Sequence, residues 1–429
     1  MSDIEATRAR LPGRRPGLIA AAAFASLAST VVAVAPSHAT PVTTRHATPV
    51  TPVADTDITF YTPPDDRVPG PHGSVIQLRP LIGDPGLAGA RNYLVLYRSI
   101  DMQGAPVAVS GTVAVPQGTP PPGGWPLISW AHGTTGVADG CAPSRDTSAE
   151  FPAHDYTSLV RDVQAQWIAA GYAVAQTDYQ GLGTPGPHGY LIGAAEQRAV
   201  TDMARAAREI EPDIGTRWVA MGHSQGGQAA IFTDAQAQQW APELQLLGAV
   251  ALAPASHQGV GLQASQLATT AGAAKALAPL TGGATSFLPL LIRGAQTVAD
   301  VDPARFLTPA TASLLTLADV GCIGQLREPG QWGDLKPDEV FSPTGDISAL
   351  TRVLNENDPS TLSFGPPLLV LQGRADTTVP PMATDAMVVQ QRAANQPVEY
   401  RTYPGVDHRG VLAASYADAL SWVNSRFGR

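Results

Sequence analysis

The central and C-terminal parts of the chain alternate short apolar runs with stretches of helical character. The runs have no polar face, which is typical of strands buried on both sides of a parallel sheet. They cover residues 126–131, 172–178, 218–221, 246–253, 367–371 and 398–403. Helices between consecutive strands would cover both faces of such a sheet. The pattern therefore predicts an α/β fold, with a mostly parallel sheet and helices on both faces.

The segment before these runs has a different pattern. Two β-rich runs, Arg91–Ile100 and Val107–Pro116, flank a turn at Gly104, which predicts an antiparallel entry into the sheet. Further along the chain, apolar residues recur at helical spacing between Ala199 and Ile210, and Pro212 follows them. This spacing predicts one crossover helix that ends before the proline.

Residues 1–39 have the order of a secretory signal peptide: arginines, an apolar run over 18–35, and small residues up to Ala39. A retained membrane anchor is the alternative, because about 18 apolar residues can just span a bilayer. Two adjacent arginines at 14–15 resemble a twin-arginine signal, but a proline follows them, so the export route stays open. We expect cleavage after Ala39 and a protein secreted to the medium or the cell envelope.

The rest of the chain divides into a linker and one domain. Residues 40–56 are rich in proline and threonine, which predicts an extended linker. Residues 57–429 are expected to form the domain. Within it, residues 256–343 lack the strand pattern and are predicted to form a mainly helical cap over the C-terminal edge of the sheet, where ligands bind in open α/β folds. An ordinary extra helical layer is the alternative.

Composition excludes several classes of protein. With 44% hydrophobic and 15% charged residues, the chain is not intrinsically disordered. The net charge is −9 without a basic stripe, which argues against nucleic-acid binding. The sequence has two cysteines and no HExxH, paired CxxC or EF-hand motif, so we infer no metal and no cofactor. Nothing in it implies a protein partner.

The sequence Gly222-His223-Ser224-Gln225-Gly226 lies between an apolar strand and a stretch that favours a helix. In a strand–turn–helix context, G-x-S-x-G is typical of a nucleophile elbow, where small neighbours let a strained turn expose the serine. The backbone amide of Gln225, at the start of the helix, would face a developing oxyanion. An incidental Gly-Ser turn is the alternative.

A serine nucleophile needs a base and an acid that follow it in the chain in this architecture. His257 and His408 are the two histidines after Ser224, and His257 opens the cap, so we expect His408 to be the base. Asp376 ends the buried strand 367–371 and its loop, where a carboxylate would orient the imidazole. Asp407 is the rival, but as the neighbour of His408 in sequence its side chain should point away from the ring.

The loop after the strand 126–131 should supply the second donor of the oxyanion hole. The backbone amide of Thr134 is the first choice and that of Gly133 the second. We expect His132 to be a structural residue that bonds to the backbone. The GxGxxG match at residues 181–186 is interpreted as a loop, because prolines surround its third glycine and no helix begins there.

Cys141 and Cys322 are expected to form a disulfide, since export places them in an oxidising compartment. Such a bond would tie the cap to the rim of the predicted site. Two buried thiols are the alternative.

The motifs in their order resemble the secretory lipase family, which is related to fungal lipase A. The resemblance rests on GHSQGG, AHGTTG, TDYQGLG, GRAD and DHRG, and covers about residues 75–429. It implies an α/β-hydrolase fold with a cap, and hydrolysis of triacylglycerols or other neutral carboxylic esters. It also implies that Ser224, Asp376 and His408 are nucleophile, acid and base. The fungal relatives carry an acidic residue in the oxyanion loop where this chain has Gly and Thr.

The expected function is therefore that of a secreted serine hydrolase that cleaves lipid esters through an acyl-enzyme. The expected partner is a neutral lipid or another ester, and a lipid–water interface is a candidate binding surface. An acyltransferase and a non-catalytic binding protein on the same scaffold are the alternatives. Few basic residues occur in the cap, which disfavours anionic substrates. Four of its leucines are expected to line an acyl pocket: Leu290, Leu291, Leu314 and Leu315.

Overall fold

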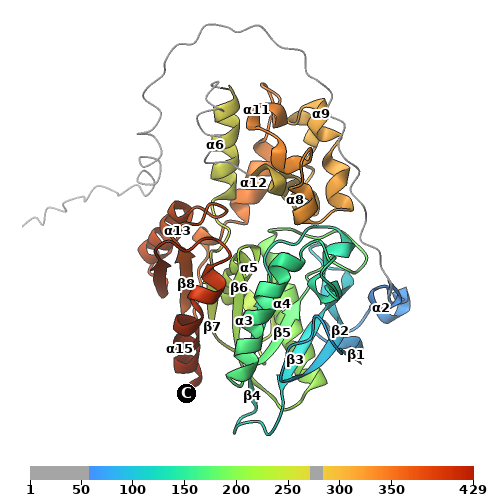
Figure 1. Ribbon diagram of the computed structural model, residues 1–429, viewed down its shortest axis with the longest axis vertical. Coiled ribbons are helices and arrows are strands. Elements are labelled where there is room, and N and C mark those ends of the chain that lie inside the picture. The colour runs from blue at the N-terminus through green and yellow to red at the C-terminus, as the bar shows by residue number, and fades with distance from the viewer. Residues whose placement is uncertain (1–57, 271–283) are drawn as a thin grey trace, which may run out of the picture. The chain divides into compact units, whose positions relative to one another are not determined.

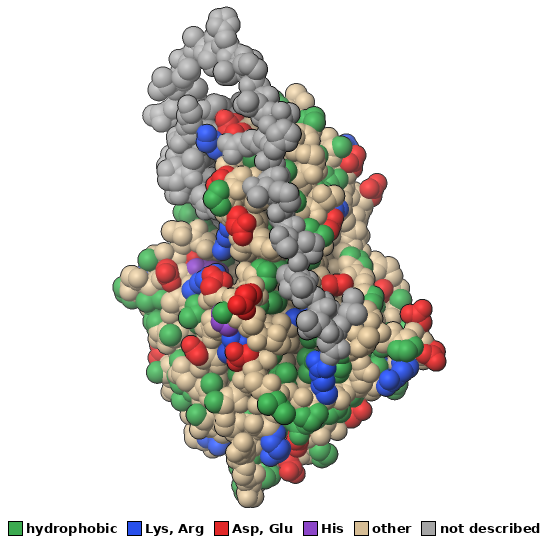
Figure 2. All heavy atoms as spheres, turned by 45° about the vertical axis from the view of Figure 1, so that its right-hand side comes forward, with side chains coloured by type: hydrophobic (Ala, Val, Ile, Leu, Met, Phe, Trp, Pro, Cys, Tyr) green, Lys and Arg blue, Asp and Glu red, His purple; other side chains and the backbone are tan. Residues whose placement is uncertain are grey.

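The computed structural model describes residues 58–270 and 284–429, which fall within one compact unit. The predicted signal peptide, 1–39, and the predicted linker, 40–56, lie outside these residues. In the described part of the chain, no helix is both long and apolar enough to cross a bilayer. On the face drawn in Figure 2, acidic and basic side chains are interspersed among uncharged ones.

A nine-stranded sheet forms the centre of the fold, in the spatial order β1-β2-β3-β5-β4-β6-β7-β8-β9 (Figure 1). The pairs β1/β2, β2/β3 and β3/β5 are antiparallel, and every pair from β5/β4 onwards is parallel. The strands span Val75–Pro80 (β1), Ala90–Ile100 (β2), Pro106–Pro116 (β3), Trp125–Ala131 (β4), Ala173–Thr177 (β5), Ile214–His223 (β6), Gln245–Leu252 (β7), Leu368–Gly373 (β8) and Val398–Tyr403 (β9). The predicted mostly parallel sheet with an antiparallel entry is confirmed. Strand β1 was not predicted, because its short sequence is largely exposed and ends in a proline.

Helices pack on both faces of the sheet, as predicted. Helices α4 (Gly193–Ile210), α5 (Gln225–Trp240) and α13 (Pro381–Ala393) contribute to one hydrophobic core. Helices α3 (His154–Ala169) and α15 (Tyr416–Phe427) contribute to the core on the opposite face. Consecutive residues of β4 alternate between the two cores, because side chains along a strand point to opposite faces. Two short helices, α2 and α14, span Ile58–Tyr61 and Val411–Ala414.

The region after β7 forms a mainly helical cap with a hydrophobic core of its own. Its helices are α6 (Gln258–Thr270), α8 (Leu288–Gln296), α9 (Pro309–Ala312), α10 (Ile323–Leu326), α11 (Pro337–Val340) and α12 (Ser348–Glu356). The core of the cap extends past the predicted boundary at residue 343, because α12 packs against α6 and α8. It also includes Tyr190, Leu191 and Ile192 from the loop before α4, which join the cap to the sheet domain.

Short 3-10 helices complete the chain. They span Asp65–Arg67, Asp139–Cys141, Pro143–Arg145, Ala284–Phe287, Pro303–Arg305, Leu315–Asp319, Trp332–Asp334 and Pro359–Thr361.

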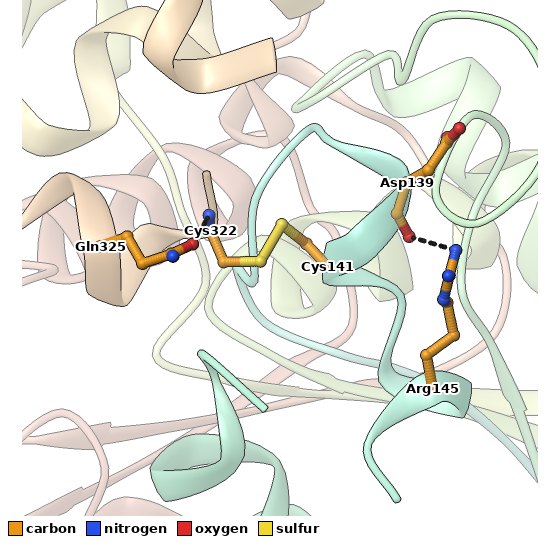
Figure 3. The surroundings of a disulfide bond; sticks show 5 residues. All are labelled: Asp139, Cys141, Arg145, Cys322 and Gln325. Atoms are coloured by element: carbon orange, nitrogen blue, oxygen red, sulfur yellow. Dashed lines mark hydrogen bonds between the residues drawn. A yellow bond between two sulfur atoms is a disulfide. The ribbon is translucent and has the colours of Figure 1, made fainter. Parts of the chain in front are cut away.

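The predicted disulfide between Cys141 and Cys322 is present, and both residues are fully buried (Figure 3). It joins the loop after β4 to the residue that precedes α10. Next to it, the Ile323 amide donates to the Thr135 carbonyl at 2.8 Å, and Gly136 forms a β-bridge with Cys322. One segment of the cap is therefore held against the loop after β4 by covalent and hydrogen bonds.

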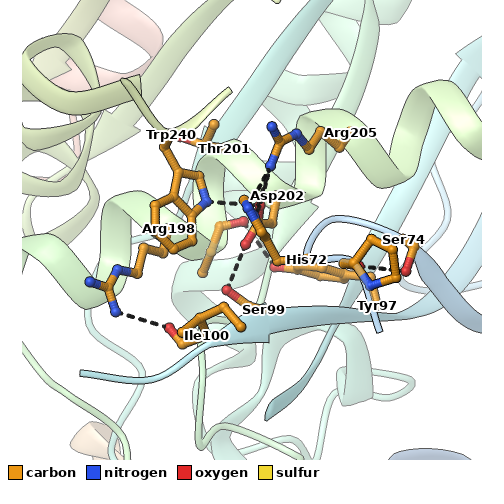
Figure 4. Close-up of polar contacts among 12 residues, drawn as sticks. His72, Ser74, Tyr97, Ser99, Ile100, Arg198, Thr201, Asp202, Arg205 and Trp240 are labelled. Atoms are coloured by element: carbon orange, nitrogen blue, oxygen red, sulfur yellow. Dashed lines mark hydrogen bonds and ion pairs between the residues drawn. The ribbon is translucent and has the colours of Figure 1, made fainter. Parts of the chain in front are cut away.

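Asp202 is a buried carboxylate on helix α4 (Figure 4). It connects α4 to the segment before β1, to β2 and to α5. His72 Nδ1 and Ser99 Oγ each lie 2.7 Å from its oxygens, and Trp240 Nε1 donates to it at 2.9 Å. Arg205 lies 3.4 Å away. Several donors on one buried carboxylate offset its loss of hydration.

Glu196 is a second buried carboxyl group on α4. Its Oε1 accepts from the Gln225 side chain at 2.8 Å and from the Leu191 amide at 3.0 Å. Burial nevertheless raises its pKa to about 8, because these neutral donors do not replace the lost hydration. Glu196 is therefore protonated in the folded protein at neutral pH.

Removal of the disulfide should lower stability. The bond closes a loop of 181 residues, for which the chain-entropy model gives at most about 5 kcal/mol. We expect the double variant Cys141→Ser/Cys322→Ser to unfold at a lower urea concentration than the parent. Reductant should lower the midpoint of the parent towards that of the variant and leave the variant unchanged. Equal midpoints for parent and variant would contradict the expected stabilisation.

Stability should also depend on the proton of Glu196. Between the unfolded pKa of about 4.5 and the folded pKa of about 8, the folded state holds a proton that the unfolded state has released, so stability falls as pH rises. The neutral Glu196→Gln variant lacks this contribution. Its unfolding midpoint should decline less between about pH 5 and 9 than those of the parent and of the exposed control Glu328→Gln. Identical slopes in all three proteins would show that Glu196 does not titrate in this range.

Candidate active site

Ser224 occupies the turn between β6 and α5. Its backbone is in the left-handed region, with φ 61° and ψ −115°, which costs a non-glycine residue about 1–3 kcal/mol. Several hydrogen bonds hold this conformation. The Ser224 amide donates to the Leu252 carbonyl at 2.8 Å, and its carbonyl accepts from Gly227 at 2.9 Å and from Ala255 at 3.1 Å. The turn is therefore held by hydrogen bonds to the end of β7, to the first turn of α5 and to the residue that precedes the cap.

The flanking glycines are required by close packing. A Cβ atom on Gly226 would overlap the carbonyl group of Ala131 at the end of β4, and one on Gly222 would overlap the carbonyl of Gly226. A side chain at either position would push α5 away from the sheet. The pattern G-x-S-x-G is thus a steric condition for this turn, as the sequence predicts.

His408 lies between Ser224 and Asp376. Its Nε2 is 3.0 Å from Ser224 Oγ, and its Nδ1 is 2.7 Å from Asp376 Oδ2. Because an ionised carboxylate only accepts, Nδ1 carries the proton and donates to Asp376, which leaves Nε2 free to accept from the serine hydroxyl. The tautomer that a general base needs therefore follows from the position of the carboxylate.

Asp376 is buried and receives several other hydrogen bonds. The amides of Thr378 and Val379 donate to Oδ1 at 2.8 and 2.9 Å, and the Gln372 side chain donates to Oδ2 at 3.0 Å. These donors satisfy the oxygens of the buried carboxylate and fix it in place. The rival acid, Asp407, instead accepts from the Gly410 amide at 2.7 Å within its own loop. The three residues selected from the sequence are thus brought together, and Asp407 is directed elsewhere.

The structure separates the two candidates for the second oxyanion donor. The Gly133 amide already donates to the Tyr156 hydroxyl at 2.7 Å, which favours the first choice, Thr134, over Gly133. In the described part of the chain, no residue accepts from the Thr134 amide, and Thr134 lines the pocket beside Ser224. Gln225 is the first residue of α5, whose initial amides have no partner within the helix.

A hydrogen-bonded network that the sequence did not reveal surrounds this site. The Tyr156 hydroxyl, from α3, lies 3.0 Å from His223 Nδ1, and His223 Nε2 donates to the His408 carbonyl at 2.8 Å. Burial is the main reason why the pKa of His223 is well below its usual value, so the ring is neutral and makes both bonds. The network connects the Gly133 loop to the backbone of His408. The position of His223 inside the elbow motif was its only signal in the sequence.

Other predicted structural residues behave as expected. His132 Nδ1 donates to the Gly133 carbonyl at 2.6 Å, and burial lowers its pKa to about 4. The glycine-rich stretch 181–186 is a loop in which Gly181 and Gly183 have positive φ, and α4 begins only at Gly193. Asp178 lies buried beside this loop and accepts from Ser110 Oγ at 2.7 Å.

A pocket of about 190 Å³ opens beside Ser224. The cap contributes Phe287, Ile323 and Arg327 to its wall. The expectation that four cap leucines line this pocket is wrong, because they pack in or against the core of the cap itself: Leu290, Leu291, Leu314 and Leu315. Helical periodicity identifies apolar side chains, but not which of two apolar surroundings they face. Among the residues that the structure describes, no group of His, Cys, Asp or Glu side chains could hold a metal ion.

Comparison with known proteins gives the family. A family model described as secretory lipase matches residues 158–429, which is more than half of the chain. Lipase A of Moesziomyces aphidis is 25% identical over 391 residues, covering 86% of this chain and 80% of that protein. A Mycobacterium tuberculosis protein described as a probable inactive lipase is 25% identical over 388 residues, covering 88% and 83%.

Solved structures show the same fold. Candida antarctica lipase A in its closed state matches with a TM-score of 0.66 and 20% identity, over 86% of this chain and 85% of that one. The rice cell wall degrading esterase LipA of Xanthomonas oryzae matches with a TM-score of 0.62 and 17% identity, over 83% and 98%. At these identities the likeness establishes the α/β-hydrolase fold. Together with the match to the family model, it shows that this chain belongs to the secretory lipase family.

Proposed function

We propose that this protein is a secreted serine hydrolase that cleaves carboxylic esters, such as triacylglycerols or related lipid esters. The observation that carries the proposal is the pair of contacts that His408 makes, at 3.0 Å to Ser224 and at 2.7 Å to Asp376. Membership of the secretory lipase family supports the class of substrate. The sequence of residues 1–39 supports export.

In the proposed mechanism, His408 takes the proton of Ser224 while the serine oxygen attacks the ester carbonyl. The amides of Gln225 and Thr134 donate to the oxyanion of the tetrahedral intermediate. His408 then protonates the leaving alcohol, and a water molecule hydrolyses the acyl-enzyme. Asp376 keeps the imidazole in the required tautomer and stabilises its charged form.

The two alternatives differ from this proposal in measurable ways. An acyltransferase would use the same three residues but pass the acyl group to an alcohol, so product analysis with added alcohol separates the two activities. A non-catalytic protein is the other alternative, since one relative is described as a probable inactive lipase. Covalent labelling of Ser224 by a fluorophosphonate would argue against that alternative, because labelling requires an activated serine.

Replacement of Ser224 with alanine should abolish the hydrolysis of 4-nitrophenyl butyrate and the labelling by fluorophosphonate. A nucleophile that acts together with its base typically accounts for about a million-fold in rate. The fold should persist, because alanine is smaller than serine, and circular dichroism checks this. Ser313→Ala, on the exposed surface of the cap, is the matched control. Activity of Ser224→Ala within tenfold of the parent would rule out the proposed nucleophile.

Asp376→Asn should reduce activity far more than Asp407→Asn, although both changes remove one carboxylate, from a contact of His408 and from its sequence neighbour respectively. An amide at position 376 favours the wrong imidazole tautomer, for which serine proteases lose about ten-thousand-fold. Asp407 contacts its own loop, so its loss should leave the tautomer unchanged. The measurement is kcat for a short ester, and equal losses would mean that the acid is placed wrongly.

A further inference from the structure

The pocket beside Ser224 contains two arginines with different surroundings. Arg409 follows His408, and its guanidinium forms an ion pair with Asp155 at 2.7 Å. Arg327 comes from the cap, and no carboxylate oxygen of the described residues lies within 4 Å of its guanidinium. The pocket thus has one arginine whose charge is matched by a protein carboxylate and one whose charge is not.

The contacts of Arg327 orient its side chain without neutralising it. The guanidinium lies 4.9 Å from the centre of the Phe287 ring, and its Nε donates to Ser286 Oγ at 3.4 Å. Asp407, the acidic residue among those that line the pocket, accepts from the Gly410 amide at 2.7 Å and forms no ion pair with Arg327. Arg327 is exposed at the mouth of the pocket; desolvation and, secondarily, the charge of Arg409 lower its pKa, whereas the charges of Tyr190 and Asp155 act in the opposite direction. An anion bound to this guanidinium would offset both its desolvation and its repulsion by Arg409.

The backbone near Arg327 is fixed in position. Arg327 directly follows α10, which begins beside the disulfide of Cys322, and the Ile323 amide donates to the Thr135 carbonyl at 2.8 Å. The segment that carries Arg327 is therefore attached to the loop that carries Thr134. A cation whose backbone is fixed beside the pocket can select a substrate by charge, because only its side chain has to be ordered on binding.

We propose that Arg327 binds a carboxylate on the substrate, so that the preferred ester carries one negative charge near its scissile bond. This rests on the proposed function and revises the expectation, based on the few basic residues of the cap, that anionic substrates are disfavoured. A guanidinium presents paired N–H donors that match the two oxygens of a carboxylate. A monoanion is favoured because one guanidinium of the pair remains without a carboxylate partner.

The test compares esters that differ only in this charge. Monomethyl adipate against dimethyl adipate places the carboxylate on the acyl side, and 4-acetoxybenzoate against methyl 4-acetoxybenzoate, followed by acetate release, places it on the alcohol side. The parent should have a higher kcat/KM for the anionic member of at least one pair. In Arg327→Gln this preference should fall by about tenfold or more, since charge-assisted hydrogen bonds contribute on this scale. Arg305→Gln, which removes an exposed cap arginine paired with Asp346, should keep the parental preference.

Binding provides a readout that is independent of turnover. In the Ser224→Ala background, calorimetry should show tighter binding of monomethyl adipate or 4-acetoxybenzoate than of the neutral partner, and Arg327→Gln should remove the difference. If the parent hydrolyses no ester, the proposed function fails and this binding experiment alone decides the role of Arg327. If neutral esters are hydrolysed and neither measurement changes in Arg327→Gln, the anion site is refuted while the hydrolase stands.

Discussion

The left-handed backbone of Ser224 is the constraint on which the site depends. The turn places Ser224 at the pocket and starts α5 at once with Gln225, whose amide has no partner within the helix. Its cost is offset by hydrogen bonds to Leu252, Gly227 and Ala255. Because Ala255 is the last residue before the cap, the same bonds also fix the point from which the cap departs. The strained turn, the end of β7 and the start of the cap are thus held together by the same set of hydrogen bonds.

The loop after β4 is the second segment on which the site depends, because it makes several of the contacts that shape the pocket. Within ten residues it carries the Thr134 amide, the bond from Ile323 to Thr135, and the disulfide at Cys141. A displacement of α10 would therefore move the proposed oxyanion donor as well as the cap wall of the pocket. This arrangement explains why the cap can present a charged side chain at a defined place, although its own core is separate from that of the sheet domain.

The buried polar network around His223 explains why the two candidate amides of the oxyanion loop are not equivalent. Tyr156 accepts from the Gly133 amide and bonds to His223, which in turn holds the carbonyl of His408. A neutral His223 suits this role, because a positive charge on its ring, 4.5 Å from that of His408, would oppose the imidazolium of the proposed mechanism. Burial keeps the pKa of His223 low and the pKa of Tyr156 high, so both remain uncharged near neutral pH.

The sequence by itself determined the parallel sheet, the elbow and the choice of Ser224, Asp376 and His408, because strand periodicity and chain order in an α/β fold restrict where a nucleophile, acid and base can lie. Tertiary structure alone decided which groups fill the space between elements. It assigned the Gly133 amide to Tyr156, the cap leucines to the core of the cap and Arg327 to the pocket wall. These outcomes depend on contacts between segments far apart in the chain. Local patterns record that a side chain is apolar or charged, whereas the packing of distant elements decides what it faces.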